Sequence, residues 1–204
     1  MKTVASIILC LCLAGYAVAS DDWAYELSQE ARNIYANKTI QIPCQRIPAL
    51  LAENNSQDLY IAIRDAGLFQ DKSCHPIIQK NRRVLKQMPM VKDAVAFYLL
   101  RLGDKQQMKI LVNDFDKEAS ATGDHATVDL FGYLKDWDIS GVRLVRHAAY
   151  SDAVGSELLC SAIVWRRYLY GEKNFKDNWY RVGKKEKVDI RRLDHFYETC
   201  RVEP

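Results

Sequence analysis

The chain has 204 residues, of which 29 are Lys or Arg and 26 are Asp or Glu, so its formal net charge is +3. This near-neutral balance argues against a nucleic-acid-binding protein at the level of the whole chain. The length is sufficient for one domain with a substantial apolar core.

Residues 1–19 have the features of a secretory signal peptide. One early cation, Lys2, precedes an apolar core at 4–14, and Ala17-Val18-Ala19 fits an A-x-A cleavage site. Cleavage removes only Lys2 among the charged residues, which lowers the net charge from +3 to +2. The sequence therefore predicts an exported protein, secreted or periplasmic, and no other apolar run approaches the ~18 residues needed to span a bilayer.

The first half of the mature chain is expected to form short helices separated by turn residues. Ser56 is placed as a helix N-cap, Gly67 as a C-terminal stop, and Pro76 and Pro89 bracket the last helix of this half. The segments with apolar residues at helical spacing are 21–36, 47–53, 56–67 and 76–88.

The stretch 91–150 contains the same helix–turn–helix pattern twice. In the first copy an apolar stripe ends at Gly103-Asp104 and a second stripe follows, which predicts two antiparallel helices joined by a tight turn. The pattern recurs 32 residues further on, where Asp136 takes the place of Asp104. The stripe residues are Val95, Tyr98, Leu99, Leu102, Met108, Leu111, Val112 and Phe115 in the first copy, and Thr127, Leu130, Phe131, Leu134, Ile139, Val142, Val145 and Ala149 in the second.

A period of roughly 30–50 residues with paired helices is typical of an α-solenoid. The segments Leu100-Arg101-Leu102-Gly103-Asp104 and Tyr133-Leu134-Lys135-Asp136 resemble HEAT-type repeats, in which an aspartate commonly lies in the turn between the two helices. The resemblance covers about a third of the chain. It implies an all-α fold of helical hairpins stacked as a short HEAT-like α-solenoid. A compact irregular helical bundle with hairpins of similar length is the alternative.

The last part of the chain is expected to form two helices with a loop between them. Residues 154–170 are the longest helical pattern, and the last helix starts near Asp189. Residues 172–183 are aromatic and polar and are expected to form a loop packed by its own aromatic side chains. No segment has a convincing strand pattern, so residues 20–204 are predicted to form a single all-helical domain. The last helix presents Ile190, Leu193, Tyr197 and Cys200 on one side.

Four cysteines remain after removal of the signal peptide, and an even number in an exported chain indicates disulfide bonds. Four cysteines allow three pairings. The pairs Cys44–Cys74 and Cys160–Cys200 are favoured, because each joins neighbouring helical segments and ties down one end of the domain. Sequons for N-glycosylation start at Asn37 and Asn54 and matter only in a eukaryotic source.

The sequence contains no recognised catalytic constellation. Asp114, Asp116, Glu118 and His125 are conceivable as a metal site, but the metalloprotease and calcium-loop spacings are missing, so a solvated loop is the favoured interpretation. No catalytic residue, metal or cofactor is assigned. A small secreted enzyme, or a ligand or metal carrier with a site between helices near His125 or His147, is the alternative function.

A cationic stretch with aromatic neighbours lies near the C-terminus. Such a surface fits an acidic partner, an anionic glycan or a membrane surface. A solvated helix start, partly balanced by Glu186 and Asp189, is the competing interpretation. The stretch contains Trp179, Arg181, Lys184, Lys185, Lys187, Arg191 and Arg192, and Arg166-Arg167 extends it if successive helices stack.

These features predict an exported helical-repeat protein that acts as a binding or scaffold module. Helical repeats present an extended face, and we expect a protein partner of acidic character to bind there. No nucleic acid and no membrane span are expected, and the oligomeric state stays open. The candidate partner-binding residues are Arg166, Arg167, Trp179, Arg181, Lys184 and Lys185.

Overall fold

The structure, a computed structural model, describes residues 40–118, 126–150 and 153–200, and every regular element in these ranges is helical. The all-α prediction is confirmed. The expected signal peptide, the helix at 21–36 and the sequon at Asn37 lie outside the described residues. None of the described helices is long and apolar enough to cross a bilayer. The elements are η1 (Cys44–Arg46), α2 (Ile47–Ala52), α3 (Ser56–Leu68), η2 (Lys72–Cys74), α4 (His75–Leu85), α5 (Pro89–Arg101), α6 (Gln107–Glu118), α7 (Ala126–Gly132), η3 (Trp137–Gly141), α8 (Val142–Tyr150), α9 (Ala153–Tyr170), α10 (Glu172–Lys185) and α11 (Ile190–Thr199).

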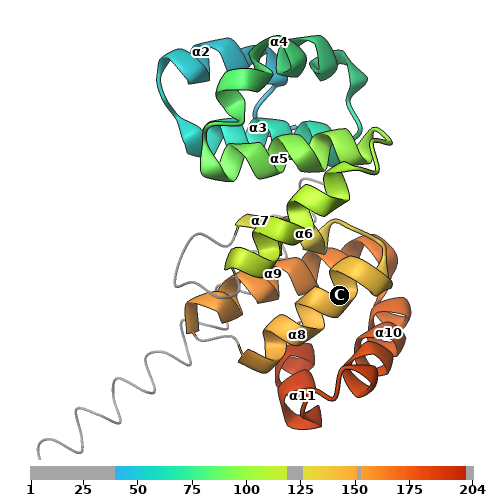
Figure 1. Cartoon of the computed structure of the whole chain (residues 1–204). Coiled ribbons are helices and arrows are strands. Elements are labelled where there is room, and N and C mark those ends of the chain that lie inside the picture. Colours follow the sequence, from blue (N-terminus) through green and yellow to red (C-terminus); the bar gives the residue numbers. More distant parts are fainter. Residues whose placement is uncertain (1–39, 119–125, 151–152, 201–204) are drawn as a thin grey trace, which may run out of the picture.

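The helices form two groups that α6 joins. In Figure 1 the first group holds α2 to α5, the second holds α7 to α11, and α6 runs from the end of α5 into the second group. Within the first group α3 packs along α5. Gly67 permits this approach, because a Cβ there would lie 2.9 Å from Phe97 Cδ1 and 3.0 Å from Tyr98 Cα. The N-cap of α3 is Asn55 rather than Ser56, since the Asn55 side chain accepts a hydrogen bond from Asp58 N (3.1 Å).

Both predicted turn aspartates accept hydrogen bonds at the start of the next helix. Gly103 follows α5 with a φ of 108°, and Asp104 then accepts a hydrogen bond from Gln106 N (3.2 Å). Asp136 accepts one from Ile139 N (2.8 Å) at the start of η3, which is a π-helical turn. The two hairpins are unequal, because α5 has 13 residues and α7 has 7. The HEAT-like stacking stays a prediction.

The aromatic segment at 172–183 is helical, so the loop expected there is wrong. Within α10, Phe175, Trp179 and Val182 are buried at positions i, i+4 and i+7. Trp179 Nε1 also donates a hydrogen bond to Leu193 O (3.1 Å), which ties α10 to α11. Charged and amide residues surround this stripe in the sequence, and burial against η3 and α11 stabilises the helix despite them.

The four cysteines beyond residue 19 form the favoured pairs. Cys44 is bonded to Cys74 and Cys160 to Cys200, with Cα–Cα distances of 5.7 and 5.0 Å. Both distances fall in the ordinary disulfide range of roughly 4.4–6.8 Å. The first bond joins η1 to the start of α4, and the second joins α9 to the end of α11. Two buried disulfides fit an oxidising compartment.

Candidate functional site

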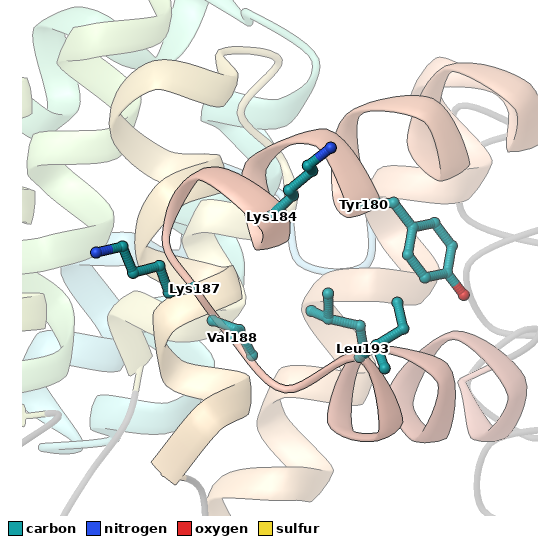
Figure 2. Close-up of a pocket in the computed structure, with 6 residues that line it drawn as sticks. Tyr180, Lys184, Lys187, Val188 and Leu193 are labelled. Atoms are coloured by element: carbon teal, nitrogen blue, oxygen red, sulfur yellow. The ribbon is translucent and has the colours of Figure 1, made fainter.

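A groove lies between the end of α10 and the start of α11. Its volume is about 410 Å³, and Figure 2 shows Val188 and Leu193 at its centre with the ammonium groups of Lys184 and Lys187 directed outward. Gly183 lets Leu193 lie directly against α10, because a Cβ there would overlap Leu193 Cδ1. The lining residues are Tyr180, Lys184, Lys187, Val188, Ile190 and Leu193.

A sharp reversal of the backbone after α10 forms this groove. Lys187 adopts a left-handed φ of 58°, and Val188 N donates a hydrogen bond back to Gly183 O (3.0 Å). Asp189 then caps α11 by accepting a hydrogen bond from Arg191 N (2.9 Å). The reversal leaves apolar side chains from both helices facing the same opening.

The carboxylates beside the groove are already engaged, whereas its lysines are not. Lys184, Lys185 and Lys187 are exposed, and no carboxylate of the described chain lies within ion-pair distance of them. The groove is therefore apolar at its centre and positively charged at its margin. The engaged carboxylates are Glu186 with Arg146 (2.7 Å), Asp189 with Arg191 (2.8 Å) and Asp194 with the Tyr180 hydroxyl (2.7 Å).

Two ionisable groups next to the groove have shifted pKa values. Burial raises the pKa of Tyr180, and its hydrogen bond to Asp194 raises it further, so the phenol stays a donor. Hydrogen bonds from Arg191 hold the pKa of Asp189 below its usual value, so this cap stays ionised. The carboxylates of Asp189 and Asp194 are therefore both engaged by side chains of the protein.

The structure places only half of the predicted partner-binding residues at the surface. Arg166, Arg167 and Trp179 are buried, at 0%, 6% and 0% exposure. The prediction of surface contacts is wrong for these three, because each makes hydrogen bonds inside the protein. The exposed members of the predicted set are Arg181, Lys184 and Lys185.

Arg166 holds the segment that connects α7 to α8. Burial lowers the pKa of Arg166 to about 10, and no carboxylate of the described chain forms an ion pair with it. The ring of Trp137 lies 4.7 Å from its guanidinium carbon. Hydrogen-bond acceptors and this ring therefore surround the guanidinium in place of water. The acceptors of its hydrogen bonds are Phe131 O (2.8 Å), Leu134 O (2.5 Å), Asp136 O (3.1 Å) and Ser140 Oγ (2.6 Å).

Arg167 anchors the C-terminal end of α11. Its guanidinium donates to Tyr197 O (2.7 Å) and Cys200 O (2.8 Å) and forms an ion pair with Glu172 (2.6 Å). Burial raises the pKa of Glu172, but hydrogen bonds from Arg167 and Tyr197 outweigh this effect and hold it below its usual value. Arg167 thus positions both helices that line the groove.

The sequence does not predict that apolar side chains of α10 and α11 line a common groove. Because the sequence predicts a loop at 172–183, it does not place Tyr180 on a helix. Ile190, expected on the same side of the last helix as Leu193, is 55% exposed at the groove. The detectable signal is the spacing of Phe175, Trp179 and Val182, which matches one face of a helix.

The acidic stretch considered as a metal site is divided between two ion pairs. Asp114 lies 3.1 Å from Lys92, and Asp116 lies 2.9 Å from Arg143. Both carboxylates therefore have cationic partners on α5 and α8. The side chain of Glu118 lies outside the described residues.

The two histidines of the alternative function do not form a described site. His125 lies outside the described residues. His147 is buried, and its ring meets Phe115 edge-on with 5.8 Å between centroids. This environment is that of a packed core side chain.

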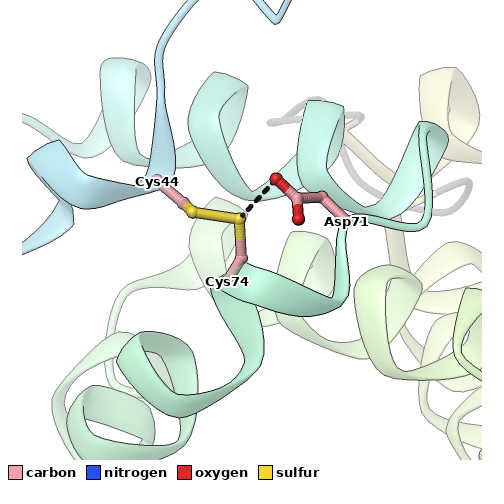
Figure 3. A group of neighbouring side chains, drawn as sticks. All are labelled: Cys44, Asp71 and Cys74. Carbon is pink, nitrogen blue, oxygen red and sulfur yellow. Dashed lines mark hydrogen bonds between the residues drawn. A yellow bond between two sulfur atoms is a disulfide. The ribbon is translucent and has the colours of Figure 1, made fainter.

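Another group of metal-ligand atoms consists of Cys44, Asp71 and Cys74, which lie within 4.8 Å of one another. Figure 3 shows that the two sulfurs are bonded to each other, with Asp71 Oδ2 3.3 Å from Cys74 Sγ. A metal requires thiolates as ligands, and a disulfide supplies none. In the oxidised protein this group is a disulfide beside a carboxylate.

A buried polar cluster surrounds Asp129 and joins the two helix groups. Its carboxylate accepts hydrogen bonds from the hydroxyls of Tyr60 (3.1 Å), Tyr133 (3.2 Å) and Ser161 (2.7 Å). The guanidinium carbon of Arg64 lies 5.8 Å from the Tyr60 ring and 5.9 Å from the Tyr133 ring. Each hydroxyl hydrogen is directed at Asp129, so the cluster fixes α3 to α7 and α9.

This cluster predicts a loss of stability at alkaline pH. Burial raises the pKa of Tyr60 and of Tyr133, and Asp129 raises both further. The folded state therefore retains protons that the unfolded chain loses above about pH 10, and stability falls by about 1.4 kcal/mol per pH unit for each tyrosine. In urea unfolding between pH 9.5 and 11.5, the double variant Tyr60→Phe and Tyr133→Phe should reduce this slope. The remainder comes from Tyr98 and Tyr180, whose pKa values are also raised.

Tyr150→Phe is the matched control for the alkaline experiment, because the Tyr150 side chain is 86% exposed. It should leave the slope of stability against pH unchanged. An unchanged slope in the double variant would show that the two buried phenols ionise in the folded protein.

Comparisons of the chain with protein-family models, with curated proteins and with solved structures gave no match.

Proposed function

We propose that this protein is an exported binding module that holds an acidic segment of a protein partner in the groove between α10 and α11. The observation that carries the proposal is the combination of an apolar centre with margin lysines that have no described ion-pair partner. An occupant of matching chemistry carries one apolar side chain flanked by carboxylates. The apolar residue lies on Val188 and Leu193, and the carboxylates lie near Lys184 and Lys187.

The size of the groove fits one side chain and short flanking segments. Burying one leucine or phenylalanine contributes roughly 1.5–3 kcal/mol, and each exposed ion pair adds roughly 0.2–1 kcal/mol. An isolated peptide would therefore bind in about the high micromolar to millimolar range. A folded partner gains affinity from further contacts along the neighbouring helices.

Export is supported by the pattern at 1–19 and by the two disulfides. The HEAT-like arrangement, in which hairpins present one extended face, is part of the same proposal. It gives a partner surface beyond the groove, and the groove then forms the end of that face.

The groove is tested with a fluorescein-labelled peptide in which one leucine is flanked by two glutamates on each side. We expect measurable binding by fluorescence anisotropy at 50 mM NaCl, and weaker binding when glutamines replace the glutamates. Lys184→Gln with Lys187→Gln should weaken binding about 2- to 30-fold, because two exposed ion pairs are lost. Ile190→Ser tests the apolar contribution at a side chain that is 55% exposed, so it should not disturb folding.

The matched control removes two lysines elsewhere. Lys105→Gln with Lys109→Gln lowers the net charge equally at exposed positions near the start of α6 and should leave peptide affinity unchanged. Equal weakening by both pairs would mean that only net charge matters. Absence of peptide binding by the unaltered protein would also refute the groove as a peptide site.

The partner itself is sought by crosslinking residues 20–204 in the native extracellular or periplasmic fluid, with identification by mass spectrometry. A true partner should crosslink through Lys184, Lys185 or Lys187. The Lys184→Gln, Lys187→Gln variant should no longer capture this partner, whereas the Lys105→Gln, Lys109→Gln variant should still capture it. If the variant without Lys184 and Lys187 captured the partner equally well, the binding face would lie elsewhere.

A further inference from the structure

A second cationic surface lies on α4, apart from the groove. Between Lys72 and Lys92 the chain carries six basic residues and no aspartate or glutamate, in a protein whose whole net charge is only +3. This stretch includes η2, all of α4 and the start of α5. A concentration of one sign over so short a segment creates a local positive field. The basic residues are Lys72, Lys80, Arg82, Arg83, Lys86 and Lys92.

The fold turns three of these cations outward in one row. Ile78 and Leu85 are fully buried, and they mark the side of α4 that faces the other helices. Lys80, Arg83 and Lys86 are exposed and follow one another at intervals of three residues. Neighbours at this spacing lie about 5–6 Å apart on a helix surface. The row therefore presents one positive charge in nearly every turn of the helix.

The row carries no compensating charge in the described chain. No described carboxylate lies within ion-pair distance of Lys80, Arg83 or Lys86. Lys92, by contrast, is paired with Asp114 at 3.1 Å. Figure 1 shows α4 at the top of the molecule and α10 and α11 at its lower end, so the row and the groove lie on different parts of the surface.

The shape and chemistry of this surface favour a linear polyanion over the other occupants. A bilayer-inserting helix needs an exposed apolar face, but the apolar side of α4 is buried and Val84, at 50% exposure, is the exposed large apolar residue on the helix. A regular row of exposed cations on the convex side of a helix matches instead a chain with closely spaced anionic groups. In an exported protein the corresponding class is a sulfated polysaccharide.

We propose that the outward face of α4 binds a sulfated polysaccharide through Lys80, Arg83 and Lys86. Sulfate groups spaced along the sugar chain pair with successive cations, and release of counterions from the polyanion drives binding. The α4 site and the groove thus take different ligands. The protein joins a protein partner at one end to an anionic polysaccharide at the other.

The test measures binding of a heparin octasaccharide by isothermal titration calorimetry between 50 and 300 mM NaCl. The variant is Lys80→Gln, Arg83→Gln and Lys86→Gln in the full mature chain, and glutamine preserves helix propensity at these exposed positions. We expect affinity to fall about tenfold or more. The plot of log affinity against log salt should also flatten by about 2 units, because three cation–anion contacts are lost.

The matched control is Lys184→Gln, Lys185→Gln and Lys187→Gln, which removes three charges at the groove. It should keep heparin affinity within about threefold while losing the acidic peptide, and the α4 variant should do the opposite. The two triple variants therefore test the polysaccharide proposal and the peptide proposal separately, and either one can fail while the other holds. Hyaluronan, with one carboxylate per disaccharide, should bind far more weakly than heparin because its charges are sparse.

Four results would overturn the proposal. The first is no heparin binding by the unaltered protein, and the second is equal loss in both triple variants. The third is tighter α4-dependent binding of a DNA duplex of equal charge than of heparin, which would assign the face to a nucleic acid. Equal binding of hyaluronan would reject recognition of closely spaced sulfates.

Discussion

Replacing Arg166 with methionine is expected to lower the free energy of unfolding by about 4 kcal/mol. Methionine fills part of the same volume but donates no hydrogen bond. The carbonyls of Phe131, Leu134 and Asp136, which now receive the guanidinium hydrogens, would lose this donor. The segment between α7 and α8 would then have to reorganise or admit water. Such a loss is a large fraction of the stability of an ordinary domain.

Urea unfolding followed by circular dichroism at pH 7 measures the effect. Arg166→Lys should recover only part of the loss, because an ammonium group cannot reach four acceptors that the planar guanidinium contacts from two nitrogens. Arg181→Met is the matched control at an exposed arginine and should change stability by no more than about 0.5 kcal/mol. An Arg166→Met protein with an unaltered midpoint would mean that the buried hydrogen bonds contribute little.

Removal of the Cys160–Cys200 bond by alanine at both positions is expected to cost about 4 kcal/mol by the chain-entropy model. The bond spans a sequence separation of 40 residues and fixes the end of α11 to α9. Without it, Arg167 remains as the main polar anchor at this end of α11. We therefore expect faster amide hydrogen exchange in α11 as well as a lower urea midpoint.

The other disulfide is the matched control for this experiment. Cys44→Ala with Cys74→Ala opens a loop with a separation of 30 residues, so its stability cost should lie within about 0.5 kcal/mol of the first. Its effect on exchange should appear in η1 and α4 and spare α11. If α11 exchanged equally in both variants, the Cys160–Cys200 bond would not be what anchors that helix.

Local patterns in the sequence were sufficient for much of the fold. Gly103 and Asp104 mark the turn between α5 and α6 because a left-handed glycine and a short acceptor side chain act on their immediate neighbours. The sequence favoured the observed disulfide pairing but left three pairings possible, because each bond joins residues that lie 30 or 40 positions apart in the chain. The residues that line the groove did not follow, because they come together only when α10 and α11 pack.

Local sequence patterns do not predict whether Arg166, Arg167 and Lys184 are buried or exposed. All three are cations in a basic, aromatic part of the chain, and nothing in their immediate sequence separates an interior role from a surface role. The structure buries the first two because carbonyl groups of α7, of the segment 134–136 and of the C-terminal end of α11 converge on α9 and accept hydrogen bonds from them. In the described chain no such group of carbonyls surrounds Lys184, and its side chain is exposed to water.

The sequence by itself determined that this protein is all-α and where helices such as α5 end, because helical spacing and turn residues act between neighbours in the chain. It favoured one of three disulfide pairings, and the structure decided among them. The tertiary structure alone decided that 172–185 is a helix, which cations are exposed, and that the two cationic surfaces lie apart. The physical reason is that a charged side chain is buried or solvated according to the acceptors that distant segments bring to it.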